Sequence, residues 1–127
     1  MGKIILALSL MASFAYAELK WASSYEAALT QAKKEKKKVM LMLSRENCPA
    51  CEYMSDIVFE ENAVINEVHK NFIPVHIDIH NDFIPEGLGY MGTPTFHFLD
   101  ANGKKIGRYD GAANIPSFIG ILGKYKK

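Results

Sequence analysis

The first part of the chain after residue 17 carries a helical pattern followed by an apolar run. In residues 24–38, SYEAALTQAKKEKKK, four apolar residues recur at the spacing of one helix face: Tyr25, Ala28, Leu29 and Ala32. Residues 38–44, KVMLMLS, are almost continuously apolar, which is typical of a strand covered on both faces. We therefore predict a helix that leads into a central strand.

The segment after residue 48 has helical spacing in two pieces. Its apolar residues fall into two groups: Met54, Ile57 and Val58, and then Val64, Ile65 and Val68. We predict a helix that begins near the cysteines, breaks around residues 61–62 and continues to about Lys70.

The patterns that follow are those of strands and turns. Residues 72–80, FIPVHIDIH, predict a strand, and the turn-forming residues 81–92 leave room for one short helical turn. Residues 93–100 and 104–111 predict two strands joined by a tight turn at 101–103. These last two strands should form a hairpin.

The chain closes on a predicted helix over residues 114–127, with Asn114 as its cap and Pro116 in its first turn. Early strands thus alternate with helices, and the last two strands pair with each other. This order predicts an α/β fold with a central mixed sheet, helices on both faces, and a C-terminal β-hairpin followed by a helix.

The first seventeen residues have a different composition. A basic residue near the start is followed by the apolar run IILALSLMASFA and by small residues at Ala15 and Ala17. This is the pattern of a secretory signal peptide cleaved before Glu18, and the run is shorter than the roughly 20 residues of a membrane span. We predict a signal peptide at 1–17, one domain at 18–127, export, and no stable membrane insertion after cleavage. An uncleaved anchor is the alternative.

The length and the net charge of the chain exclude some classes of function. The chain has 127 residues and a formal net charge of +1, which fits a single domain without a strong basic field. Binding to nucleic acid needs such a field, so we expect no nucleic-acid partner. Two cysteines are too few for a disulfide-rich scaffold. No segment suggests dimerisation, and we expect a monomer.

The two cysteines lie three positions apart in the sequence NCPAC, shortly after the predicted strand 38–44. Cys48 should therefore lie at a helix N-terminus, where unpaired N–H groups and the helix dipole favour the thiolate. Cys51 follows one helical turn later, so the two sulfurs can bond with little backbone movement. Pro49 suits the first turn, and Ala50 adds neither a proton nor a charge. We predict that Cys48 attacks a partner disulfide and that Cys51 resolves the mixed disulfide.

Two other uses of the pair stay open. Structural zinc usually has four ligands, and no second CxxC is present. Among the histidines, His76 and His80 would share one face of a strand, but neither these nor His69 and His97 have tight ligand spacing to the cysteines. A purely structural disulfide would close a very short loop and stabilise little. We favour redox cycling, with no metal and no organic cofactor, because the dithiol itself carries two electrons.

Together with a second motif, the pair resembles the thioredoxin-fold family. In thioredoxin-like proteins a cis-proline opens the strand that faces the redox pair, and Pro94 in GTPT (92–95) matches that proline. Thr93 matches the residue before it. The resemblance implies that Thr93 and Pro94 bind the extended backbone of the partner.

The N-terminal part adds a more specific likeness. KWASSYEAALTQAKKEKKKVMLML resembles the opening of exported thioredoxin-like proteins related to the C-terminal domain of the periplasmic thiol:disulfide interchange protein. In that group the tryptophan precedes the first helix, which implies that Trp21 is a packing residue.

The residues that flank the pair depart from the thioredoxin pattern. Thioredoxins commonly carry tryptophan before the first cysteine and a buried acid six residues before it, where this chain has Asn47 and Met42. That acid is thought to assist loss of the proton from the second cysteine. Without it, we expect Cys51 to lose its proton to Glu46, Glu52 or water.

The residue before the second cysteine is a further departure. Periplasmic oxidants often place a histidine where Ala50 stands, so we expect the pKa of the Cys48 thiol to be lowered less than in those oxidants. The resemblance implies a periplasmic thiol:disulfide oxidoreductase, leaning towards a protein-disulfide reductase. Its partners would be protein thiols and disulfides, with a membrane thiol-electron donor and apocytochromes c as candidates. The alternative is a redox-inactive module that holds a client or a metal on the same fold.

Overall fold

The computed structural model describes residues 18–127, so the predicted signal peptide at 1–17 lies outside the described residues. The elements in chain order are α1 (Tyr25–Glu35), β1 (Lys38–Ser44), α2 (Pro49–Asp56), the 3₁₀ turn η1 (Val58–Glu60), α3 (Asn62–Asn71), β2 (Phe72–Asp78), β3 (Thr95–Leu99), β4 (Lys105–Asp110) and α4 (Ile115–Tyr125). None of the helices in the described range is both long enough and apolar enough to cross a membrane.

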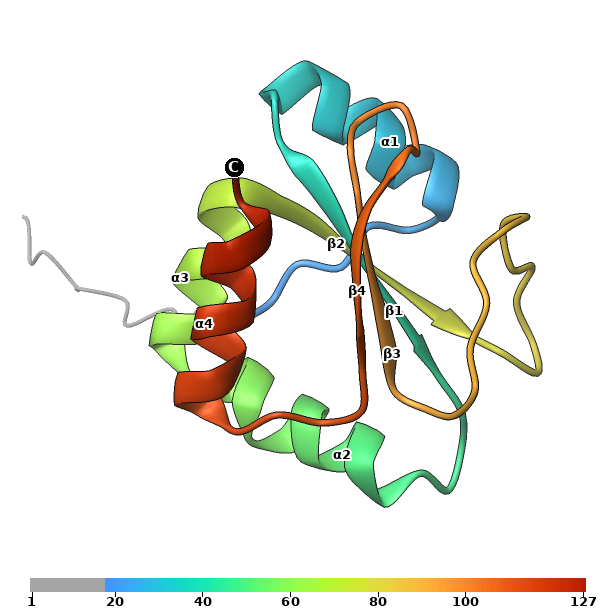
Figure 1. The fold of residues 1–127 in the computed structure, drawn as a ribbon, viewed down its shortest axis with the longest axis vertical. Coiled ribbons are helices and arrows are strands. Elements are labelled where there is room, and N and C mark those ends of the chain that lie inside the picture. Colours follow the sequence, from blue (N-terminus) through green and yellow to red (C-terminus); the bar gives the residue numbers. More distant parts are fainter. Residues whose placement is uncertain (1–17) are drawn as a thin grey trace, which may run out of the picture.

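The strands form one mixed sheet in the order β2-β1-β3-β4 (Figure 1). The strand β1 pairs parallel with β2 and antiparallel with β3, while β3 and β4 form an antiparallel hairpin. Met42 in β1 lies opposite His76 in β2 and Phe96 in β3. The predicted mixed sheet and C-terminal hairpin are confirmed.

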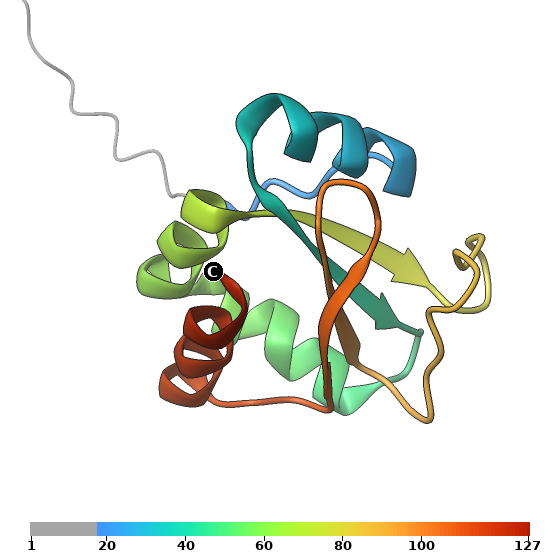
Figure 2. The ribbon, with the colours of Figure 1, turned by 45° about the horizontal axis from the view of Figure 1, so that its top comes forward.

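Helices cover both faces of this sheet, as predicted. Figure 2 shows α1 on one side of the strands and α2, α3 and α4 on the other. Because successive side chains of a strand point to opposite faces, β1 contributes to two separate cores. Val39, Leu41 and Leu43 pack with α1, whereas Met40 and Met42 pack with the other three helices.

The core beneath α2, α3 and α4 is built around aromatic rings. Phe59 makes edge-to-face contacts with Phe118 at 5.4 Å and with Phe96 at 6.1 Å between ring centroids. Trp21 lies against Phe59 in the same manner, at 5.4 Å. Such contacts add about 0.5–1.5 kcal/mol each beyond the burial of apolar area. Trp21 is thus a packing residue, as the resemblance implied.

Several element boundaries differ from the predictions, and two of these differences bear on the core or on a predicted site. The first helix after the cysteines ends at Asp56, earlier than predicted, and the chain passes through η1 before α3. Val58 and Phe59 lie in η1, and both are buried in the same core as Met54 of α2.

The strand β2 also ends earlier than predicted, at Asp78. The carboxylate of Asp78 accepts the N–H groups of His80 at 2.8 Å and Asn81 at 3.3 Å, which makes a side-chain turn that stops the strand. His80 therefore lies in a turn. The expectation that His76 and His80 share a strand face is wrong.

Candidate active site

The turn between β1 and α2 is set by Asn47, which adopts a left-handed backbone with φ of 54°. Asparagine tolerates this conformation better than bulky residues do. The Arg45 guanidinium donates to the carbonyl oxygens of Glu46 at 3.1 Å and Asn47 at 3.0 Å, which holds the turn. The asparagine that departs from the thioredoxin pattern is thus the residue that turns the chain into α2.

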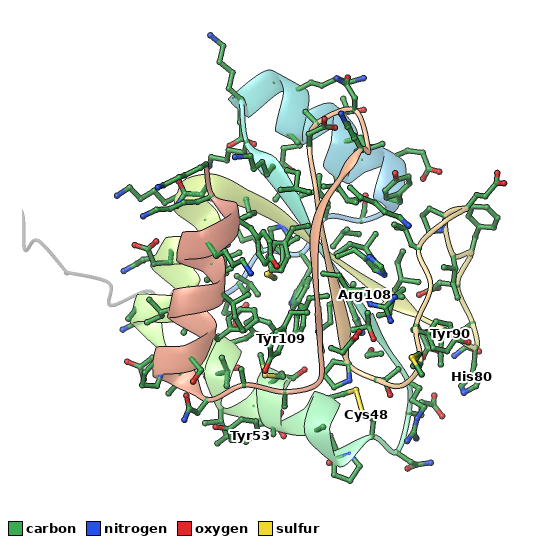
Figure 3. All side chains as sticks on the ribbon, in the orientation of Figure 1. Cys48, Tyr53, His80, Tyr90, Arg108 and Tyr109 are labelled. Carbon is green, nitrogen blue, oxygen red and sulfur yellow. A yellow bond between two sulfur atoms is a disulfide. The ribbon has the colours of Figure 1, made fainter. Side chains whose placement is uncertain are left out.

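Cys48 is the N-cap of α2 and Pro49 occupies the first turn, as predicted. The N–H of Cys51 donates to the Cys48 sulfur at 3.2 Å. The two cysteines form a disulfide, with their Cα atoms 5.2 Å apart. Figure 3 shows this disulfide at the start of α2, next to the edge of the hairpin. Both cysteines are nearly buried, with exposed fractions of 2% and 6%.

Thr93 and Pro94 lie directly against this pair. The Thr93 hydroxyl donates to the Cys48 sulfur at 3.3 Å, and the Thr93 carbonyl oxygen lies 3.5 Å from the same sulfur. The Thr93–Pro94 peptide bond is cis. The structure therefore brings together the four residues that the sequence singled out as catalytic or substrate-binding.

The end of β4 holds Pro94 in place. The N–H of Gly111 donates to the Pro94 carbonyl oxygen at 2.8 Å. Gly111 has φ of +94°, a conformation that side chains with a Cβ rarely adopt. An open hollow of about 220 Å³ lies here, and Thr93, Pro94 and Gly111 are among the residues that line it.

The loop at 79–94 joins β2 to β3 and ends on Thr93 and Pro94. Tyr90 and Met91 are exposed, Met91 almost completely at 96%. The buried ring of His97 in β3 fixes the loop, because its Nε2–H donates to the Gly89 carbonyl oxygen at 2.8 Å. The other ring nitrogen, Nδ1, is buried without a hydrogen-bond partner in the described part of the chain. Burial lowers the pKa of His97, and the bond to Gly89 opposes that shift.

Close to the cysteines, the sheet carries the apolar side chain of Met42 and a hydrogen-bonded polar pair, Ser44 and His76. Met42 is 1% exposed and packs in the same core as Cys48 and Cys51. Next to it, the Ser44 hydroxyl is hydrogen-bonded to Nε2 of His76. Sequence reasoning missed Ser44 and weighed His76 only as a metal ligand. The contact depends on the pairing register of β1 with β2, which the two apolar runs do not reveal.

Metal binding gains no support from side-chain positions. Among residues 18–127, no three or more His, Cys, Asp or Glu side chains come together in a way that could hold a metal ion.

The family model described as "Thioredoxin-like domain" matches residues 25–126. No curated protein matches the chain. A solved thioredoxin from Thermus thermophilus is 26% identical, with a TM-score of 0.69 over 84% of this chain and 86% of that one. The oxidised C-terminal domain of DsbD from Neisseria meningitidis is 20% identical, with a TM-score of 0.63 over 78% and 90%. The periplasmic thioredoxin SoxS from Paracoccus pantotrophus is 16% identical, with a TM-score of 0.59 over 71% and 96%. This chain belongs to the thioredoxin-like family.

Proposed function

We propose that the protein is an exported, periplasmic thiol:disulfide oxidoreductase that reduces disulfides in partner proteins with its Cys48–Cys51 pair. The observation that carries this proposal is the set of donors around one sulfur. Cys48 accepts the N–H of Cys51 and the hydroxyl of Thr93, and it lies at the start of α2. Hydrogen bonds to the charged form and the positive end of a helix both favour a thiolate. The thiolate is the species that attacks disulfides.

The reaction begins with the reduced pair. The Cys48 thiolate attacks one sulfur of a partner disulfide, the partner S–S bond breaks, and its electron pair leaves on the second partner sulfur. Cys51, as a thiolate, then attacks the Cys48 sulfur and displaces the first partner sulfur. The pair ends as the disulfide seen in the structure, and the partner has gained two electrons and two protons.

Thr93 and Pro94 bind the partner in this scheme. Thr93 is half-buried beside the Cys48 sulfur, and the open hollow next to Pro94 can accept the chain that flanks the partner cysteine. Tyr90 and Met91, which shortly precede Thr93 in the chain, are exposed and are available for apolar contacts with the partner.

The sequence and the relatives support the reducing direction and the periplasmic location that we propose. Pro49 and Ala50 carry no charge that would stabilise the reduced form strongly, as a strong oxidant requires. The signal-peptide pattern favours export, and the likeness to the periplasmic thioredoxin SoxS favours the periplasm. A membrane thiol-electron donor upstream and apocytochromes c downstream are the partners we propose.

Reduction of insulin disulfides tests the proposal. The protein with residues 1–17 removed should reduce insulin when supplied with a dithiol, and Cys48→Ser should abolish the activity. Activity that persists in Cys48→Ser would refute the assignment of Cys48. Stoichiometric retention of zinc or copper, with no disulfide exchange, would instead favour a binding module on the same fold.

A further inference from the structure

The side of α2 that carries Cys51 faces an open hollow of about 420 Å³, called here the Cys51 hollow. Its lining includes Ser44 from β1, His76 from β2, and Cys51 and Ser55 from α2. Ser55 lies four positions after Cys51, so both project from one side of the helix. The Cys51 hollow is therefore the place where the nearly buried Cys51 thiol meets polar side chains and solvent.

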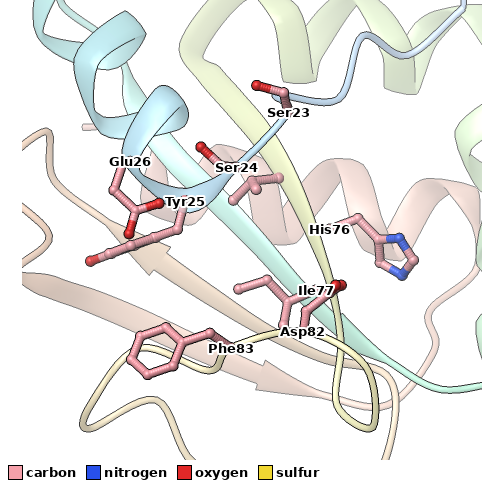
Figure 4. A pocket seen from close by; sticks show the side chains of 9 residues that line it. Ser23, Ser24, Tyr25, Glu26, His76, Ile77, Asp82 and Phe83 are labelled. Carbon is pink, nitrogen blue, oxygen red and sulfur yellow. The ribbon is translucent and has the colours of Figure 1, made fainter.

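Ser44 and His76 line the side of this hollow that the sheet forms, Ser44 buried and His76 exposed. His76 lies opposite Met42 across the β1–β2 pair, and Ser44 is two positions beyond Met42, so all three point to the face that α2 covers. Figure 4 shows the His76 ring projecting from β2 away from Tyr25 and Phe83. Ser44 is 6% exposed, and its hydroxyl is hydrogen-bonded to Nε2 of His76.

The surroundings of His76 keep it neutral near pH 7. Burial of part of the ring lowers its pKa, and the carboxylates of Asp78 and Asp82 oppose that shift without reversing it. The ring of Trp21 lies 5.7 Å away on the N-terminal segment. The charged groups that face it across the Cys51 hollow are Arg45, Glu46, Glu52 and Asp56. A neutral imidazole with one unprotonated nitrogen is able to accept a proton.

The chemistry of Cys51 requires such an acceptor. Its thiol must lose a proton before it attacks the mixed disulfide, and the buried Met42 offers none. Glu46, Glu52 and His76 all line the hollow and all have exposed side chains, but of these three it is His76 that is hydrogen-bonded to a buried hydroxyl in the hollow. The Ser44 hydroxyl is buried and fixed against His76, and general-base catalysis depends on such a fixed position.

We propose that His76 is the proton acceptor for Cys51, reached through the Ser44 hydroxyl, when Cys51 resolves the mixed disulfide. This inference rests on the proposed function. The Cys51 S–H bond breaks, Ser44 takes that proton and passes its own to Nε2 of His76, and an imidazolium results. The Cys51 electron pair then forms the bond to the Cys48 sulfur, and the electron pair of the broken mixed disulfide leaves on the partner sulfur. The imidazolium afterwards releases its proton to solvent or to the departing thiolate.

The test separates the two steps by rapid mixing of the reduced protein with the chromogenic disulfide dithiobisnitrobenzoate. The first equivalent of coloured thiolate reports attack by Cys48, and the second reports resolution by Cys51. At pH 7, His76→Ala should slow the second phase by about 100-fold, the lower range of general-base catalysis, and leave the first phase unchanged. Ser44→Ala should slow the same phase. The matched control is His80→Ala, because His80 is exposed in the turn after β2 and does not line the Cys51 hollow.

Two readouts distinguish proton transfer from a structural role. The second-phase rate of the wild type should level off above the pKa of His76, whereas in His76→Ala it should keep rising with pH. Added imidazole should restore the second phase of His76→Ala. An unchanged second phase in either Ser44→Ala or His76→Ala would overturn the inference, and so would equal slowing of both phases. The same holds if Glu52→Gln slows the second phase and neither Ser44→Ala nor His76→Ala does. A wild type that shows no first phase would instead refute the proposed function.

Discussion

The Cys48 sulfur accepts the hydroxyl of Thr93 at 3.3 Å, although 45 positions separate the two residues in the chain. The contact joins the start of α2 to the segment that leads into β3. It also places a hydrogen-bond donor on the sulfur that we propose as the nucleophile. The Thr93 side chain is therefore expected to influence the chemistry of Cys48 as well as the position of the partner.

Replacing Thr93 by valine removes this donor with little change in shape. A hydrogen bond to a charged group stabilises it by about 1.5–3 kcal/mol, and the partial exposure of Thr93 reduces that figure. We expect the pKa of the Cys48 thiol to rise by about 1 unit in the reduced Thr93→Val protein. The rate of alkylation by iodoacetamide as a function of pH measures it. Thr30→Val on α1, whose hydroxyl donates to the Glu26 carbonyl, is the control. An alkylation profile that does not move would show that the hydroxyl does not stabilise the thiolate.

The unequal roles of the two cysteines predict a trapping phenotype. Without the resolving thiol, Cys51→Ser should accumulate mixed disulfides between Cys48 and partner proteins, visible as adducts that a reductant removes. Cys48→Ser should accumulate none, since its remaining Cys51 has neither the N-cap position nor the Thr93 hydroxyl that favour the thiolate of Cys48. If Cys51→Ser collects no adducts while its Cys48 still reacts with iodoacetamide, Cys51 is not the resolving residue.

Replacement of Gly111 should destabilise the folded protein near Pro94. It has φ of +94°, and its N–H donates to the Pro94 carbonyl oxygen. We expect Gly111→Ala to lower the free energy of unfolding by about 1–2 kcal/mol, because a Cβ disfavours the left-handed backbone. Gly120→Ala in α4 is a matched control, since nothing lies within 4 Å of its added Cβ. That change should raise the free energy of unfolding by about 0.5–1 kcal/mol. Urea titration measures both, and a shift of the same sign in the two variants would contradict this account.

His97 predicts how stability depends on pH. Burial lowers its pKa below the ordinary value of 6.5, so the folded protein keeps the ring neutral while the unfolded chain binds a proton below that pH. Its contribution to stability is thus present above pH 6.5 and declines as the pH falls towards the folded-state pKa. His97→Gln keeps a donor for the Gly89 carbonyl without the titration. The loss of Tm between pH 7 and 5 should be smaller in this variant than in the wild type, and His80→Gln is the control. If Tm falls equally in the wild type and in His97→Gln, the titration of His97 does not cause the fall.

Much of this site was predictable from local sequence. The apolar run of β1 and the NCPAC motif place Cys48 at a helix start, and the motif GTPT points to Thr93 and Pro94. These features are local because a helix cap and a strand start are each specified by a few consecutive residues.

The parts that were not predicted depend on contacts between distant segments. The end of α2 at Asp56 could not be predicted from the apolar periodicity, because Ile57 and Val58 continue the helical spacing. The contact between Ser44 and His76 depends on strand register, and uninterrupted apolar strands carry little register information. The cysteines could therefore be identified from the sequence, whereas the hydrogen bond between Ser44 and His76 could not.

The reduction potential of the Cys48–Cys51 pair, measured at equilibrium with glutathione, tests the central claim most directly. The residues between the cysteines, Pro49 and Ala50, add no charge that would stabilise the reduced form. We therefore expect a reduction potential of about −270 mV, as in a reductant. A value near about −120 mV would make the protein an oxidant and contradict the proposed direction. A pair that does not equilibrate with glutathione at all would contradict the redox function itself.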